Sequence, residues 1–246
     1  MTGSFLRRDG KDVSLSPLYE DNHVIIISKN VGEIVQGDKT GDTPLSEMVK
    51  AYIKEKYGKP GAVFLGVVHR LDRPVSGVVL FARTSKALTR LNEMFRTQAI
   101  QKTYWAVVQN QPPQPEATLT HYLVRNEKMN KSFAYDHERT GAKKAVLDYK
   151  VIAHSEHYHL LEVHLHTGRH HQIRCQLAAI GCPIRGDLKY GAPRSNPDGG
   201  ICLHARSIRF EHPVSHKLID VQAPIPTTGV WKGFADTIAS STTSLP

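Results

Sequence analysis

Three observations predict an α+β fold for this chain of 246 residues. Short β-branched or apolar runs recur along it, and three segments carry apolar residues at helical spacing between capping and stop residues. The strand-like runs follow one another like hairpins instead of alternating regularly with helices. Hydrophobic residues make up 40% of the chain and charged residues 22%, the balance of a folded domain. One large domain, in one or two lobes, is therefore expected.

The expected strands are apolar or β-branched runs that end at polar or turn-forming residues. In chain order they cover residues 24–28, 64–68, 78–82, 104–108, 145–152, 158–166 and 204–210.

The expected helices are three segments with clear start or stop signals. Thr43 caps the first with Pro44 at its first helical position, and Gly58 stops it. Thr84 or Ser85 caps the second. The third covers about residues 168–180 and ends at Gly181. Residues 1–17 are expected to form a loosely ordered polar arm, residues 18–230 the folded domain and residues 231–246 a tail.

Composition narrows the class of protein and its location. The three cysteines (Cys175, Cys182 and Cys202) form no C-x-x-C pair, which disfavours a disulfide framework and a cysteine zinc site. No run approaches the length of a membrane span, and charges interrupt the first ten residues, where a signal peptide would be apolar. We expect a soluble protein of the cytoplasm that does not bind membranes.

Positive charge is concentrated in two segments. The chain has 32 Lys and Arg against 23 Asp and Glu, a formal charge of +9. Residues 69–106 and 165–210 each hold seven Lys or Arg and two acids. Such clustering favours a polyanionic partner such as RNA, because binding to phosphates releases condensed counterions. The alternative at this point is a basic surface that only meets solvent.

The most informative residue is Asp72, in the polar turn 69–77 (HRLDRPVSG) between two apolar runs. Loops held by buried strands commonly present catalytic groups. The alternative is an Asp that caps the turn or pairs with Arg70 or Arg73. The chain has no phosphate-binding glycine loop, nucleophile elbow or H-E-x-x-H zinc motif that would compete with this turn.

A second group of polar residues begins the third expected helix, in 167–191 (TGRHHQIRCQLAAIGCPIRGDLKYG). His170 and Arg174 lie four residues apart and so on one helix face, where an arginine can bind a carboxylate or a phosphate. The alternative is an amphipathic helix with solvated arginines. Histidines paired at i, i+2 in 157–166 could bind a metal, but we expect a half-solvated strand face and no metal site.

Together these segments resemble the RluA-type pseudouridine synthases. The turn resembles that family's H-R-L-D-x-x-[ST]-[ST]-G, and 167–191 resembles its T-G-R-x-H-Q-[IL]-R motif with the following G-D-x-x-Y-G. Residues 101–108 (QKTYWAVV), 201–205 (ICLHA) and 221–226 (VQAPIP) resemble three further blocks in the expected order.

This sequence departs from the family pattern at four positions. Val75 replaces a hydroxyl residue, His170 replaces a small residue and Gln176 replaces a second histidine. The early K-P-x-G element has Asn30 in place of its proline. We also expect the accessory RNA-binding domain of many members to be missing, because only about 17 residues precede the catalytic domain.

The resemblance implies a two-lobed sheet with flanking helices, a central basic cleft and isomerisation of uridine to pseudouridine without cofactor or metal. It makes Asp72 the catalytic nucleophile or base, gives Arg174 a salt bridge to it, and has Tyr104 stack on the uracil and transfer a proton. On the sequence alone, without the resemblance, a strand aromatic in the core is the favoured interpretation of Tyr104. The remaining residues implied to bind substrate are His69, Arg70, Lys102, Arg169, His171 and Gln172.

The resemblance further implies a monomer that acts on ribosomal or transfer RNA. Two other functions stay open on the sequence alone. One is a basic RNA-binding protein without turnover, and the other is a metal-dependent phosphoesterase that uses the histidine-rich strand.

Overall fold

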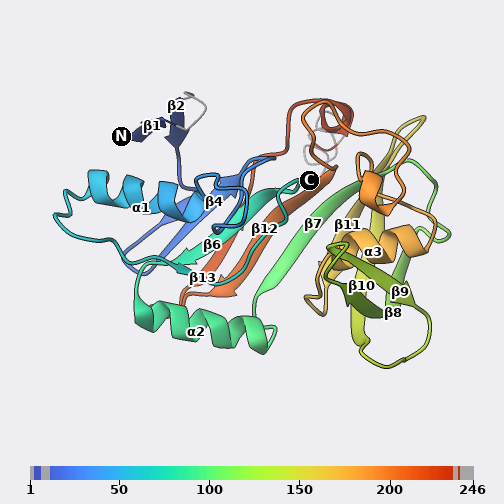
Figure 1. The fold of residues 1–246 in the computed structure, drawn as a ribbon, viewed down its shortest axis with the longest axis horizontal. Helices are drawn as coiled ribbons and strands as arrows, with labels where there is room; N and C mark the ends of the chain where they lie inside the picture. Colours follow the sequence, from blue (N-terminus) through green and yellow to red (C-terminus); the bar gives the residue numbers. More distant parts are fainter. Residues whose placement is uncertain (1–2, 7–11, 235–237, 239–246) are drawn as a thin grey trace, which may run out of the picture. The chain divides into compact units, whose positions relative to one another are not determined.

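The computed structural model describes residues 3–6, 12–234 and 238, which fold as a mixed, mostly antiparallel sheet with helices (Figure 1). The chain divides into two compact units: residues 1–100 with 207–223, and residues 101–206 with 224–246. This division agrees with the two lobes expected from the resemblance, and the α+β fold class is confirmed. The cleft expected between the lobes stays a prediction.

The first unit holds two helices and most of the short strands. Its elements are β1 (Gly3–Leu6), β2 (Asp12–Leu15), β3 (Tyr19–Glu20), β4 (Val24–Lys29), α1 (Leu45–Lys56), β5 (Gly66–Val67), β6 (Ser76–Ala82), α2 (Ser85–Arg96) and β13 (Leu218–Gln222). Within it, β4 pairs with β3 and β6, and β5 also pairs with β6, all antiparallel. The side chain of Thr84 caps α2 by accepting the N–H of Ala87 at 3.1 Å, as the sequence predicts.

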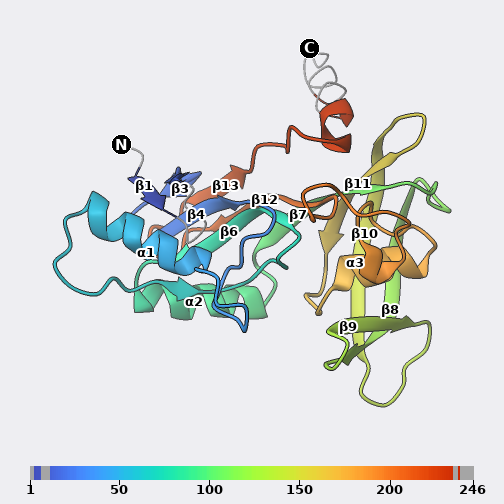
Figure 2. The ribbon, with the colours of Figure 1, turned by 45° about the horizontal axis from the view of Figure 1, so that its top comes forward.

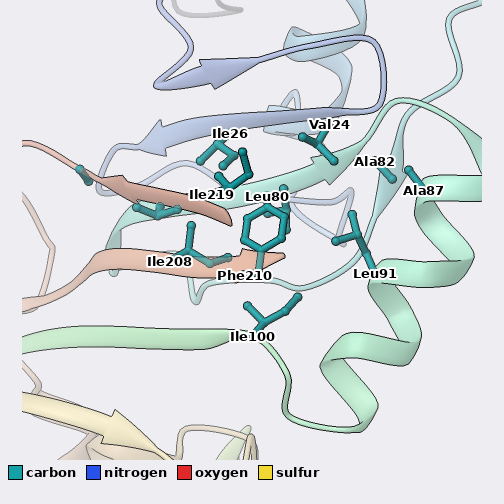
Figure 3. Packing of buried hydrophobic residues seen from close by; sticks show 12 residues of the cluster. Val24, Ile26, Leu80, Ala82, Ala87, Leu91, Ile100, Ile208, Phe210 and Ile219 are labelled. Atoms are coloured by element: carbon teal, nitrogen blue, oxygen red, sulfur yellow. The ribbon is translucent and has the colours of Figure 1, made fainter. Parts of the chain in front are cut away.

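The core of this unit follows from strand alternation. Val24 and Ile26 of β4 and Leu80 of β6 point to one side, where they meet Leu91 of α2 and Phe210 (Figure 3). The intervening residues of β4 and β6 are buried as well, so both faces of these strands are covered. Such two-sided burial explains why both runs are continuously apolar in the sequence.

The second unit is built on long antiparallel strands, on which the helix α3 packs. Its elements are β7 (Gln101–Val108), β8 (Glu116–Asn126), β9 (Lys131–Tyr135), β10 (Lys143–His154), β11 (His159–Leu165), α3 (Gln172–Ala179) and the short 3-10 helix η1 (Leu188–Tyr190). The strands lie in the order β7-β11-β10-β8-β9. Cys175 of α3 packs against Leu123 and Ala145, and α3 lies beside β8, β9 and β10 in both views (Figures 1 and 2). Strand β12 (Leu203–Glu211) divides its residues between the two units.

Several local features differ from the sequence-based expectation. The expected helix over 168–180 is shorter, because His171 adopts a left-handed conformation (φ 52°) and α3 begins only at Gln172. The expected strand over 64–68 is reduced to β5. Within the arm expected to be loosely ordered, β1 and β2 pair in antiparallel register.

At the C-terminal end, Trp231 and Phe234 are buried, so the folded part reaches beyond residue 230. The rest of the expected tail, residues 235–237 and 239–246, lies outside the described residues. No described helix combines the length and the apolar character that crossing a bilayer requires.

Candidate active site

In the first unit, the candidate catalytic residue lies in the turn between β5 and β6. Asp72 is half-buried, and its carbonyl accepts the N–H of Val75 at 3.0 Å, which closes the turn. Val75 is buried (2% exposed) and begins the apolar sequence that continues into β6, whose residues are all buried. The aspartate therefore stands just before a strand whose residues are all buried, the placement that the sequence suggested.

A lysine that the sequence analysis did not treat as functional holds this turn. Lys29, the last residue of β4, is 1% exposed, and its Nζ donates to the carbonyls of Arg73 (3.1 Å) and Val75 (2.5 Å). The signal that could have found it is the K-x-x-G element at residues 29–32, where it was noted only for its missing proline.

Of the other residues of the turn, some bond to neighbouring residues of the fold and others are exposed to solvent. The Nε2 atom of His69 accepts the N–H of Leu80 at 3.0 Å, and its ring stacks on Phe95 with centroids 5.0 Å apart. Arg73 donates to Asp42 at 2.6 Å, whereas Arg70 is exposed. The structure thus gives His69 contacts that position the turn and leaves the Arg70 side chain in solvent.

In the second unit, β7 carries two of the expected site residues. Tyr104 is 7% exposed and lies opposite Val163 of β11, on the side of the sheet that also includes Tyr149. Lys102 is half-buried, and desolvation lowers the pKa of its ammonium group. An ammonium in this setting gains more from a nearby anion than a solvated one does.

The loop before α3 is held by the side-chain amide of Gln172, which is buried. Its Oε1 accepts from Thr167 Oγ1 (2.8 Å) and from the N–H of Arg169 (2.9 Å), and its Nε2 donates to the carbonyl of Val146 (3.1 Å). These bonds attach the loop to β10. The Arg169 side chain is exposed, and its Nε donates to the carbonyl of Lys144 at 3.1 Å.

His171 stands at the start of α3 in the left-handed conformation, which costs of order 1–3 kcal/mol and persists only where surrounding contacts hold it. Its Nδ1 lies 3.0 Å from the hydroxyl oxygen of Tyr190, and its ring stacks on His170 with centroids 3.8 Å apart. His170, a departure from the family pattern, contacts Ser132 Oγ through Nδ1 at 2.9 Å. The two imidazoles and Tyr190 together orient the first turn of the helix.

Arg174, in the first turn of α3, forms a buried two-pronged ion pair with Asp187. Nε lies 2.7 Å from Oδ2 and Nη2 lies 2.9 Å from Oδ1, with the two side chains 6% and 1% exposed. Asp187 is a residue that sequence reasoning missed, although it is the Asp of the quoted G-D-x-x-Y-G block. The expected pair of Arg174 with Asp72 joins residues of different units and stays a prediction.

Gln176, which replaces the family's second histidine, is a residue of α3, and its side chain is completely buried between this helix and the sheet. Its Nε2 donates to the carbonyl of Leu119 at 3.1 Å and lies 3.0 Å from Nδ1 of His121. This departure therefore belongs to the packing of the helix on the sheet.

Two histidines of the histidine-rich segment lie beside carboxylates. His164 lies 3.1 Å from Glu162, and His166 lies 2.5 Å from Asp148. Among the described residues, no group of three or more His, Cys, Asp or Glu side chains could hold a metal ion.

Comparison with known proteins defines the class to which this fold and these motifs belong. The family profile for RNA pseudouridylate synthase matches residues 23–179, and the chain belongs to that family of RNA-modifying isomerases. A Bacillus subtilis protein named as an uncharacterized RNA pseudouridine synthase (YlyB) is 30% identical over 217 residues, covering 87% of this chain and 70% of the relative.

One further relative and one solved structure add detail. The ribosomal large subunit pseudouridine synthase D of Xanthomonas campestris is 32% identical over 229 residues, covering 88% of this chain and 67% of its own length. The solved structure of human RNA pseudouridylate synthase domain containing 4 superposes with a TM-score of 0.71 at 24% identity, covering 86% of this chain and 88% of the human chain. That structure supports the fold.

Proposed function

We propose that this protein converts specific uridines of ribosomal RNA to pseudouridine with Asp72 as the catalytic carboxylate. The observation that carries the proposal is the turn 69–77, which presents an aspartate directly before a fully buried strand and fixes its backbone through a buried lysine. An isomerisation needs no oxidant, reductant or group donor, so the proposal includes no cofactor.

The reaction exchanges one bond of the base for another. The N1–C1′ glycosidic bond breaks with Asp72 acting at the ribose as nucleophile or base, and the uracil is turned while it is held in the site. A C5–C1′ bond then forms, C5 loses its proton and N1 ends with one. The atoms of substrate and product are the same.

Tyr104 and Arg174 support this chemistry in the proposed mechanism. The Tyr104 ring stacks on the extruded uracil, as aromatic side chains do for flipped bases, and its hydroxyl transfers the proton. We assign to Arg174, held in place by Asp187, the salt bridge to the carboxylate of Asp72.

The remaining expected site residues form two groups, one available to bind RNA and one bonded within the fold. Arg70 and Arg169 are exposed and Lys102 is half-buried, so these three are proposed to bind RNA phosphates. His171 is proposed to contact the RNA as well. The Nε2 atom of His69 and the side-chain amide of Gln172 bond within the fold. We therefore propose that these two position the turn and the loop that meet the RNA.

The names of relatives such as the Xanthomonas enzyme favour the large ribosomal subunit as the source of the substrate. We further propose that the protein acts in the cytoplasm as a monomer. Transfer RNA is the other substrate to test.

The test offers the purified protein unmodified transcripts of large-subunit ribosomal RNA and, separately, of transfer RNA. After digestion, chromatography separates pseudouridine from uridine. Pseudouridine in the ribosomal transcript is the expected result. Pseudouridine only in transfer RNA would show that transfer RNA, and not ribosomal RNA, is the substrate. RNA that is bound but unchanged in both would show an RNA-binding protein without turnover.

A further inference from the structure

The strands of the second unit have one face under α3 and one on the opposite side. Leu123 of β8, Ala134 of β9 and Ala145 of β10 all belong to the apolar cluster that packs with Cys175 of α3. Because successive side chains along a strand point to opposite faces, the residues next to these three point away from the helix. Their side chains are therefore available for a role other than packing α3.

Three of these side chains form a row across the strands. Tyr122 of β8 lies directly opposite Tyr135 of β9 on one side and Lys144 of β10 on the other. Directly opposed residues have Cβ atoms roughly 4.5–5.5 Å apart, so the three side chains are neighbours on one face. Both tyrosines are partly exposed, and Lys144 is exposed. This tyrosine row (Tyr135, Tyr122 and Lys144) thus presents two aromatic rings and a cation.

An arginine lies at each end of the tyrosine row. Arg139 is an exposed residue between β9 and β10, and its guanidinium lies over the ring of Tyr135, 4.0 Å from the ring centroid. At the other end, Arg169 is exposed, and its Nε donates to the carbonyl of Lys144 at 3.1 Å. The row is therefore positively charged at both ends.

The charge and the planar groups of this face fit RNA with unpaired bases. Aromatic rings and guanidinium planes stack on such bases, and Lys and Arg bind the phosphates between them. Residues 122–144 hold six Lys or Arg against three Asp or Glu. One of these acids, Asp136, turns to the α3 side, where its carboxylate lies 3.8 Å from His121. Adjacent strands lie about 4.8 Å apart, so the row and Arg169 together extend over roughly 15 Å.

We infer that the tyrosine row, with Arg139 and Arg169, is a binding surface for unpaired nucleotides of the RNA substrate. The inference rests on the proposed function, which supplies the RNA. Sheet faces that present aromatic side chains bind single-stranded RNA by stacking two or three of its bases. The row would therefore make the enzyme prefer uridines that have a single-stranded segment nearby over uridines within a continuous duplex.

The first test measures binding of a fluorescein-labelled single-stranded oligouridine to the wild type, Tyr122→Thr and Tyr122→Phe. Threonine keeps the strand preference but removes the ring, so we expect affinity to fall about 10-fold in Tyr122→Thr. Phenylalanine keeps the stacking surface, and Tyr122→Phe should bind like the wild type. A folded Tyr122→Thr protein with wild-type affinity would overturn the inference and leave a protein as the occupant of this face.

The salt dependence of the same binding tests the cation of the row. Lys144→Met should lower the slope of log affinity against log salt by about 0.7, the share of one phosphate contact with single-stranded RNA. Lys150→Met is the matched control, because Lys150 is an exposed residue of the same strand whose ammonium group lies 3.7 Å from Glu116. The control should keep the wild-type slope. Equal slopes in Lys144→Met and the wild type contradict the inference.

Photochemical crosslinking of the wild type decides the question even if Tyr122→Thr does not fold. An oligouridine that contains 4-thiouridine is irradiated on the protein, and the crosslinked peptides are identified by mass spectrometry. We expect crosslinks at Tyr122 or Tyr135. Crosslinks confined to other segments of the chain would refute the binding surface.

Failure of the proposed function would look different, because these measurements need no turnover. If the wild type forms no pseudouridine but Tyr122→Thr weakens oligouridine binding, only the proposed activity fails. In an active enzyme, Tyr122→Thr should raise KM for the transcript more than it lowers kcat. If the wild type is active and Tyr122→Thr changes neither oligouridine affinity nor KM, the activity stands and this inference fails.

Discussion

Arg174 and Asp187 form an ion pair that is almost completely withdrawn from water, with a guanidinium plane set against a carboxylate. The guanidinium also lies over the ring of Tyr190, 5.1 Å from its centroid. A buried pair of this kind gives little net stability over apolar residues of similar volume, but it fixes the direction of a charge. In the proposed mechanism that direction serves Asp72.

Breaking this pair should destabilise the fold strongly. Asp187→Leu or Arg174→Met leaves one buried charge unpaired, and we expect each to lower the free energy of unfolding by about 3–5 kcal/mol. The double variant should lose clearly less than the sum, because it leaves neither charge. Urea unfolding of the four proteins measures this coupling, and additive losses would show that the two side chains do not interact.

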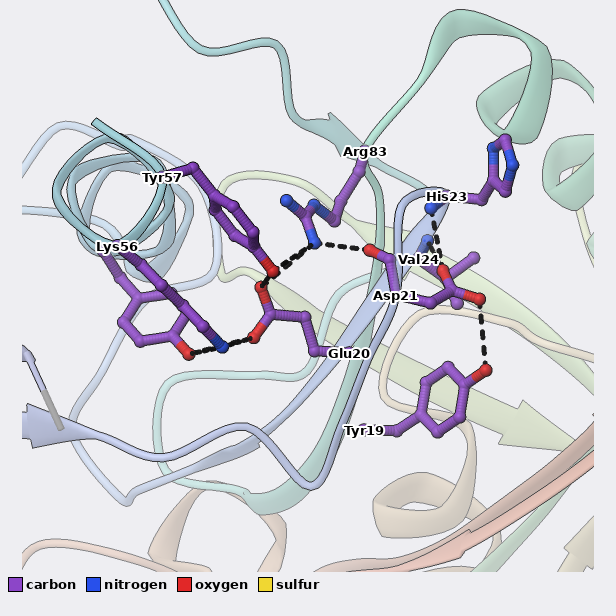
Figure 4. Close-up of polar contacts among 9 residues, drawn as sticks. Tyr19, Glu20, Asp21, His23, Val24, Lys56, Tyr57 and Arg83 are labelled. Carbon is purple, nitrogen blue, oxygen red and sulfur yellow. Dashed lines mark hydrogen bonds and ion pairs between the residues drawn. The ribbon is translucent and has the colours of Figure 1, made fainter. Parts of the chain in front are cut away.

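At the scale of elements, the end of α1 is joined to β3 by a polar cluster around Glu20 (Figure 4). Its carboxylate accepts from Lys56 Nζ (2.6 Å), Tyr52 Oη (2.9 Å), Tyr57 Oη (2.9 Å) and Arg83 Nη1 (3.0 Å). Burial raises the pKa of Glu20, but the hydrogen bonds from Lys56, Tyr57 and Tyr52 together lower it by more than burial raises it. The pKa of Glu20 therefore lies below the ordinary value of 4.5.

The depressed pKa of Glu20 predicts an acid-sensitive contribution to stability. The unfolded state binds the proton more tightly, so the contribution is full above a pH of about 4.5 and is lost as the pH falls through the folded-state value. Thermal unfolding from pH 6 to pH 3 should therefore show a smaller decline in Glu20→Gln than in the wild type. Exposed Glu47→Gln on α1 is the control, and parallel curves for Glu20→Gln and wild type would refute the prediction.

Long, continuously apolar strands and well-capped helices could be predicted from the sequence, because β4, β6 and α2 carry their signals locally. Strand β8 was missed, since alternate residues of Glu116–Asn126 face solvent and its apolar content is low. The late start of α3 could not be predicted either, because the backbone of His171 is held by contacts with residues distant in the sequence. Asp72 stood out because its turn lies between two apolar runs of the sequence. Asp187, the partner of Arg174, did not, because their pairing is a contact made only in the folded chain.

For the whole molecule, the charge of +9 is the property that concerns RNA most directly. Contacts with phosphates should make RNA affinity fall linearly with salt on a log–log scale, by roughly tenfold for each threefold rise in salt if about three phosphates are bound. Filter binding with the Asp72→Asn variant measures affinity without turnover. An affinity that is flat across this range would mean that the basic segments do not contact the RNA backbone.

The central claim is that the carboxylate of Asp72 converts uridine to pseudouridine. Its most direct test is single-turnover kinetics of the wild type and Asp72→Asn on one RNA transcript, with RNA affinity measured in parallel. Loss of a catalytic group should lower the rate of pseudouridine formation by roughly 10³-fold or more while the affinity stays close to that of the wild type. An Asp72→Asn protein that binds RNA and forms pseudouridine at a near-normal rate would contradict the account.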